Sequence, residues 1–421
     1  MEQTLVIPHE RSCRGKIFAW SLVSFVVVLR LAAVFFIPFG QKVGHHLEGL
    51  NDEPAHFNYV KYLVQHRAFP VLEHSILEPD ALVRNEFEYH QAPLYYLICT
   101  PFYRLFGENG GLAACRLLSV FFGIASLWVI ALVLRDCGCS GVVQLAAVLF
   151  VGLLPSHLYF TTLVSNDGLS WLLALLLTRS ILRYGAVIGI PWGYSAKRAA
   201  IMMAVYLAAG AMTKSSLLIF FPAAACVFIY KYYISKNRSP LVQGAFILGI
   251  PGVALLPWYV RSMMLYHSLI GTPSAPGHDF FTMQGIFGFL KATDKYFWFP
   301  MQHLHGGTPA YFILCAVGAV ILAAHMAMAI NFLVKKRCRG FPVIALLLLF
   351  LLNVAAYAWY FFFTAWGNPE ARFLFPALGS IAFFFIVPAY QFFIRLKMER
   401  LFIPYILAIA LFPYPFLLFA S

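Results

Sequence analysis

Long apolar runs separated by short polar segments recur along the whole chain of 421 residues. An apolar run of about 18 residues or more is long enough to cross a bilayer as a helix. The pattern predicts an all-α polytopic membrane protein in which residues 1–421 form a single integral membrane domain. Eleven spans are expected, near residues 17–39, 112–134, 141–163, 169–186, 199–213, 215–231, 241–262, 310–334, 341–363, 372–394 and 401–420.

Three parts of this pattern need interpretation. The first run, 17–39, follows a basic N-terminus and has no small-residue cleavage site, so a retained span is expected instead of a signal peptide. The run 93–107 is short and contains Pro101 and Arg104, so it is expected to lie on the outer face as an interfacial segment. The short runs on either side of Lys214 form two spans or one long broken helix.

Composition agrees with this class, because 61% of the residues are hydrophobic and only 11% are charged. The net charge of +13 does not indicate nucleic-acid binding. Most basic residues lie in short segments on the same side of the membrane as the N-terminus, as in KKRCR at 335–339. This distribution places the N-terminus in the cytoplasm. A bacterial plasma membrane suits a compact chain with this topology.

Two outer loops, 40–111 and 263–309, are much longer than the other connections, and long loops of this kind are usually functional. The first begins just after the first span and is expected to carry interfacial helices and a catalytic acid. The polar residues in the two loops that we take as candidates are Asp52, Glu53, His56, His90, Gln91, Tyr95, His303 and His305.

Further polar residues are expected at the outer edge of the membrane. They are Asn166, Asp167, Lys214, Glu370 and Arg372. A charge at the edge of hydrocarbon is costly unless it is paired or faces water, so each is a functional candidate. The alternative for the two basic residues is that their long side chains extend to lipid headgroups. Arg30 lies inside the first span and needs a partner that the sequence does not identify.

These residues suit sugar transfer from a lipid phosphate. A carboxylate must receive the acceptor's proton, and Asp52 is the candidate, although it could instead only cap a helix beginning at Pro54. Lys214 and Arg372 would stabilise the departing phosphate. No cofactor is required by this scheme. Asp52 and Asp167 are ligand types that could bind a divalent metal, but no motif has diagnostic metal spacing.

Five stretches in their order along the chain resemble the GT-C class of membrane glycosyltransferases, the clan of protein O-mannosyltransferases and the aminoarabinose transferase of lipid A. The stretches are NDEPAHFNYVKYL, EYHQAPLYYLICTPFYRLFG, LPSHLYFTTLVSNDGLSWLLAL, AMTKSSLLIFFPAA and ARFLFPALGSIAFF. The resemblance implies a polyprenyl-phosphate sugar donor and an inverting single displacement. It also implies that the catalytic acid is Asp52 beside Glu53, that Asp167 is a second acidic motif, and that Lys214 and Arg372 hold the lipid phosphate.

The other candidates named above are assigned to substrate binding, and the acceptor is a glycan, a lipid or a protein. Since no soluble domain follows the last expected span, the resemblance implies a lipid-linked or cell-envelope acceptor. Two other functions are compatible with the sequence: a transporter or flippase of lipid-linked saccharide, and a non-catalytic membrane assembly subunit. A transporter is less consistent with the pattern, because its polar groups usually gather at the bilayer midplane instead of one face.

Overall fold

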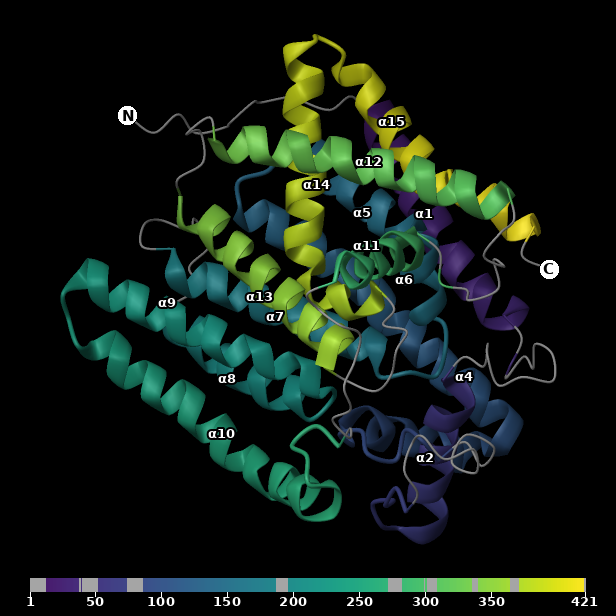
Figure 1. Ribbon diagram of the computed structural model, residues 1–421, viewed down its shortest axis with the longest axis vertical. Helices are drawn as coiled ribbons and strands as arrows, with labels where there is room; N and C mark the ends of the chain where they lie inside the picture. Colours follow the sequence, from purple (N-terminus) through teal and green to yellow (C-terminus); the bar gives the residue numbers. More distant parts are fainter. Residues whose placement is uncertain are drawn as a thin grey trace.

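The structure is a computed structural model of the chain, and its described part is a bundle of helices without a strand (Figure 1). It describes residues 13–37, 39, 52–73, 86–186, 196–271, 282–298, 300, 309–334, 340–363 and 371–419. The helices are α1 Cys13–Phe36, α2 Glu53–His66, α4 Leu94–Asp136, α5 Gly141–Leu153, α6 Pro155–Phe160, α7 Asp167–Gly185, α8 Ala196–Ala211, α9 Phe220–Ser235, α10 Ser239–Tyr266, α11 Met283–Trp298, α12 Pro309–Val334, α13 Phe341–Phe363, α14 Leu378–Arg395 and α15 Phe402–Leu411. Short 3₁₀ helices are η1 Ser215–Ile219, η2 Ala371–Ala377, η3 Glu399–Leu401 and η4 Tyr414–Phe419.

Within the described residues, seven helical segments are long and apolar enough to cross a membrane, judged by length and composition. They are Ile17–Phe36, Leu94–Asp136, Ser215–Ser235, Ser239–Tyr266, Phe312–Val334, Phe341–Phe363 and Ala371–Arg395. The all-α membrane architecture is confirmed, but the count of eleven spans is not. Several expected spans correspond to shorter helices, such as α5 with 13 residues, α8 with 16 and α15 with 10.

The run 93–107 forms the first part of the 43-residue element α4, which consists of two helices joined at a kink at Gly107. The backbone there has φ 68° and ψ −159°, a combination that only glycine adopts without strain. The expected place of this run on the outer face stays a prediction. Near Lys214, the structure favours two helices over one broken helix. Lys214 itself is extended, with φ −154° and ψ 129°, and separates α8 from η1 and α9.

The third expected span, 141–163, is broken because Pro155 cannot continue α5. Leu154 is extended, and the short helix α6 begins at the proline. The break leaves carbonyls at the end of α5 without helical partners. Buried Arg30 of α1 donates to one of them, Gly152 O, at 2.9 Å and to Thr161 Oγ1 at 2.6 Å, and its Nη2 also lies 2.9 Å from His157 Nδ1.

The centre of the bundle is α7, which packs extensively against α4 and α8. Figure 1 shows α8, α9 and α10 along one side, with α12, α14 and α15 at another. The helix α2 lies against α4. As a result the first residues of α2 and α7, together with Lys214 and η2, meet in one place.

Candidate active site

Asp52 occupies the N-cap position of α2, but its side chain makes no capping hydrogen bond. Its carboxylate instead pairs with the guanidinium of Arg372, which lies 320 positions later in η2. The Asp52 side chain is 26% exposed, so it is reachable from solvent. Helix capping alone therefore does not account for this residue.

Asp167 extends the ion pair into a cluster. It is buried at the first residue of α7 and lies 2.5 Å from Lys214 Nζ and 3.4 Å from Arg372 Nη1. The Phe373 ring faces both cations, at 5.1 Å from Lys214 and 5.5 Å from Arg372. Such rings add a cation–π attraction and hold the two heads in place. Two acids and two cations from four separate parts of the chain are thus neighbours, and we call them the outer cluster.

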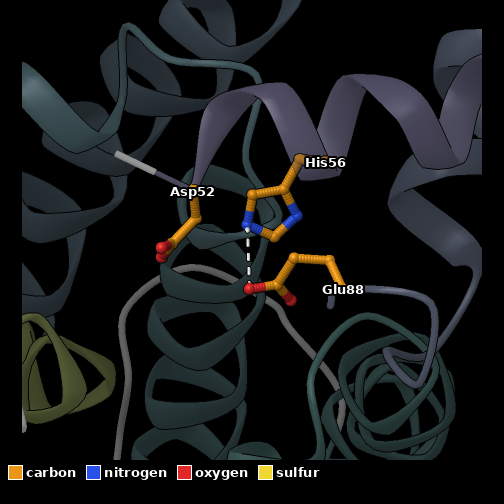
Figure 2. Close-up of side chains that lie close together, drawn as sticks. All are labelled: Asp52, His56 and Glu88. Carbon is orange, nitrogen blue, oxygen red and sulfur yellow. Dashed lines mark ion pairs between the residues drawn. The ribbon is translucent and has the colours of Figure 1, made fainter. Parts of the chain in front are cut away.

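A second group adjoins the outer cluster through Asp52 (Figure 2). Ligand atoms of Asp52, His56 and Glu88 lie within 4.8 Å of one another. His56 Nε2 faces Glu88 Oε1 at 4.0 Å, because the Nδ1 atom is bonded to Tyr96 OH at 2.6 Å. Among the described residues, buried Glu88 Oε2 has no hydrogen-bond partner. Two carboxylates, one of them with an unpartnered oxygen, and an imidazole fit a divalent cation, so these residues could hold one.

Burial sets the protonation of this group. It lowers the pKa of His56, which leaves the imidazole neutral and able to act as a metal ligand. Burial raises the pKa of Glu88. Burial also lowers the pKa of His90 to about 4. The histidines of this region are therefore neutral near pH 7.

Glu53 does not share the position of its neighbour Asp52. It is fully buried and forms an ion pair with Arg116 of α4, so its oxygens are already occupied. Tyr95 is also internal. Its hydroxyl accepts the Ser165 N–H at 3.1 Å and lies 2.8 Å from Ser119 Oγ.

Three other candidates form a polar string beside the outer cluster. Asn166 Nδ2 donates to Gln91 Oε1 at 3.3 Å and to Thr213 O at 3.1 Å. His90 lies next to Gln91, and its Nδ1 is 2.8 Å from Phe87 O. Asn166 Oδ1 is buried without a hydrogen-bond partner in the described part of the chain, so it could accept a bond from a substrate hydroxyl.

The structure does not test every candidate and adds some that the sequence analysis missed. His303, His305 and Glu370 lie outside the described residues. The additional residues are Glu88, Tyr96 and Arg116. Glu88 is one of the polar residues of the first outer loop, and Arg116 gave a signal because an arginine inside an apolar run requires a partner.

No protein-family model matches the chain, and no curated protein matches it by sequence. Solved structures do match. ArnT from Cupriavidus metallidurans bound to undecaprenyl phosphate is 12% identical with a TM-score of 0.53, and the match covers 90% of this chain and 61% of ArnT. An Archaeoglobus fulgidus oligosaccharyltransferase in complex with Zn and sulfate is 12% identical with a TM-score of 0.53, covering 93% of this chain and 52% of that one.

A third match is AglB from Archaeoglobus fulgidus in complex with an inhibitory peptide and a dolichol-phosphate, with 12% identity and a TM-score of 0.53. The match covers 95% of this chain and 55% of AglB. The chain therefore spans between half and two thirds of the length of these proteins. Identity this low speaks for the fold alone. The resemblance to the GT-C class predicted from the sequence is confirmed at that level: the chain shares the fold of these solved structures.

Proposed function

We propose that the protein is a glycosyltransferase that moves a sugar from a polyprenyl-phosphate donor to a lipid-linked or cell-envelope acceptor. The reaction takes place at the extracytoplasmic face of a membrane, with the N-terminus in the cytoplasm and a bacterial plasma membrane as the setting. The observation that carries the proposal is the outer cluster, in which Arg372 pairs with partly exposed Asp52 and with Asp167, and Asp167 also binds Lys214. The GT-C fold supports the same class of reaction.

In the proposed step, an acceptor O–H attacks the anomeric carbon from the face opposite the phosphate. The new glycosidic bond forms as the bond from that carbon to the phosphate oxygen breaks, so the configuration is inverted. Asp52 takes the acceptor's proton as general base. The electron pair of the broken bond stays on the lipid phosphate. Lys214 and Arg372 stabilise the charge that develops there, in a partly dry site where such contacts are strong.

The neighbouring side chains are assigned to substrate contact, structural support and cation binding. Asn166, Gln91 and His90 line the polar string that would contact sugar hydroxyls. Glu53 takes no part in proton transfer, because Arg116 and a backbone amide occupy its oxygens. His56 and Glu88, with Asp52, would hold a divalent cation. Such an ion, when bound, would supply positive charge that orients the acceptor oxygen.

The direct test uses the purified chain in lipid nanodiscs, supplied with a panel of undecaprenyl-phosphate-linked hexoses and pentoses and a glycan extract as acceptor. Release of undecaprenyl phosphate together with a new glycosidic bond is measured by mass spectrometry. We expect Asp52→Asn to lower this rate at least about 100-fold because the general base is lost. Binding of undecaprenyl phosphate should remain, since Lys214 and Arg372 are still present.

Two outcomes would contradict the proposal. Near-normal transfer by Asp52→Asn would remove Asp52 as the base. Movement of the lipid-linked sugar across proteoliposomes, with no new glycosidic bond for any member of the panel, would identify a transporter instead.

A further inference from the structure

A buried ion pair lies behind the outer cluster. Arg116 Nε donates to Glu53 Oε1 at 2.7 Å, and Arg116 Nη2 donates to Glu53 Oε2 at 2.5 Å. Glu53 has no exposed surface and Arg116 is 5% exposed. A two-pronged pair of this type fixes the orientation of both side chains as well as their distance.

Both partners also bind backbone groups of other segments. Arg116 Nη1 donates to Val34 O at 3.0 Å and to Ile37 O at 2.8 Å, at the end of α1. Glu53 Oε1 accepts the Val164 N–H at 2.8 Å, in the turn that precedes α7. One ion pair therefore joins the end of α1, the start of α2, the middle of α4 and the turn before α7.

Two of these segments carry the acids of the outer cluster. Glu53 directly follows Asp52, and Val164 lies three positions before Asp167. The next amide of the same turn, that of Ser165, bonds to another α4 side chain, the Tyr95 hydroxyl. We propose that Glu53 and Arg116 are positioning residues that set Asp52 and Asp167 in register on either side of Arg372. This role rests on the proposed function, since it assigns the pair to the geometry of that reaction.

Stability alone does not explain such a pair. Two buried charges lose their hydration, and replacing both partners by apolar groups of similar size is often neutral or stabilising. An apolar pair could fill the same space. It could not supply the directed bonds to Val34 O, Ile37 O and the Val164 N–H, which fix the two acid-bearing segments.

This difference gives the test. The double variant Glu53→Leu/Arg116→Met keeps an apolar fill of similar size but removes every directed bond. We expect its unfolding temperature in nanodiscs to stay near that of the wild type. The kcat for transfer should fall at least about tenfold, since small misplacements of reacting groups are costly, while the donor KM stays within about threefold. Hydrogen exchange should be faster in peptides covering 52–66 and 161–167.

A matched control lies at the other end of α7. Asp136→Asn also breaks a buried carboxylate–arginine contact, with Arg179 and Arg183, but touches no part of the site. We expect it to lower the unfolding temperature and to leave kcat within about twofold of the wild type. Loss of stability and loss of turnover are thereby separated.

A folded double variant with wild-type kcat, or with unchanged exchange in both peptides, would overturn the proposal. If that variant does not fold, Glu53→Gln keeps the side-chain volume, and the same two measurements decide. Hydrogen exchange needs no substrate, so it is independent of the proposed reaction. Normal transfer by Asp52→Asn would reject the proposed function, whereas unchanged exchange would reject the positioning role.

Discussion

Both ends of α7 lie at a cluster in which one buried acid binds two cations, but the two clusters differ in arrangement. At the first residue of the helix, Asp167 binds the cations Lys214 and Arg372. Near the last turn, Arg179 and Arg183 bind Asp136, the final residue of α4. The outer cluster also includes a second acid, Asp52. The rise of 1.5 Å per residue in an α-helix places the attachment points of the two clusters on α7 roughly 20 Å apart.

The cluster at Asp136 is closed. Its two arginines are four positions apart on one helix, and they donate three hydrogen bonds to the two carboxylate oxygens of Asp136. The outer cluster is open. Its cations lie 47 and 205 positions after Asp167 in the sequence, and Arg372 also pairs with partly exposed Asp52. The comparison teaches that charge pairing alone does not mark a functional site. The feature that indicates a functional site is an ion-pair network that includes a solvent-accessible acid, here Asp52.

Removing the acid from each cluster should give the largest contrast. We expect Asp167→Asn to lower the rate of sugar transfer by about 100-fold, because Lys214 and Arg372 lose their shared anchor. Asp136→Asn should instead lower the free energy of unfolding by about 3 kcal/mol, since it leaves two arginines beside a neutral amide. Transfer assays and chemical unfolding, measured on both variants, check the contrast. Equal losses of transfer would show that the two clusters do not differ in function.

Two lysines that each face an aromatic ring sharpen the comparison. Lys214 Nζ lies 5.1 Å from the ring of Phe373, and Lys231 Nζ lies 4.2 Å from the ring of Tyr184. We expect Lys214→Met to weaken undecaprenyl phosphate binding by about 2 kcal/mol, or roughly 30-fold, because a charged hydrogen bond to the phosphate is lost. Lys231→Met is the matched control and should bind normally. A similar loss in both variants would point to a nonspecific effect of charge.

The group Asp52, His56 and Glu88, which shares Asp52 with the outer cluster, predicts metal affinity. Tyr96 fixes the ring of His56, so Tyr96→Phe should weaken Mn²⁺ or Zn²⁺ binding about tenfold, as measured by calorimetry on the solubilised chain. Tyr103→Phe is the control, because Tyr103 of α4 packs edge-on against Phe57 of α2, the helix that carries His56. If Glu88→Gln binds these ions as tightly as the wild type, Glu88 is not a ligand.

The smallest effect is expected at an exposed pair, Lys61 with Glu108, which provides a baseline for both clusters. The side chain of Glu108 is 64% exposed, so water and salt screen the attraction. We expect Glu108→Gln to change the free energy of unfolding by at most about 0.5 kcal/mol and to leave transfer unchanged. A larger change in unfolding would assign this pair a structural role.

Most helices could be predicted from the sequence because their apolar runs are uninterrupted. The helix α13, Phe341–Phe363, has the bounds expected from its run. The predictions failed where backbone chemistry overrides hydropathy. Pro155 divides the expected span 141–163 into α5 and α6. Run length alone does not show on which side of such a residue the chain remains helical.

Part of the site could also be predicted from the apolar runs, because charged residues beside them stand out in the sequence. Asp52, Asp167, Lys214 and Arg372 were found in this way, and the structure brings them together. Their roles stay predictions. The sequence analysis took Asp52 as the base with Glu53 beside it, but it could not show that Glu53 is buried against Arg116. Neighbours at the start of a helix point in different directions, which only packing decides.

Buried Arg30 has a consequence for how the protein is made. Its described hydrogen-bond partners, Gly152, His157 and Thr161, are synthesised more than 120 positions after it. The first span must therefore enter the membrane before these groups exist, at a cost of about 2.5 kcal/mol or more for an arginine deep in a span. We therefore expect Arg30 to gain these hydrogen bonds only after the region around Pro155 has been synthesised and has packed against α1.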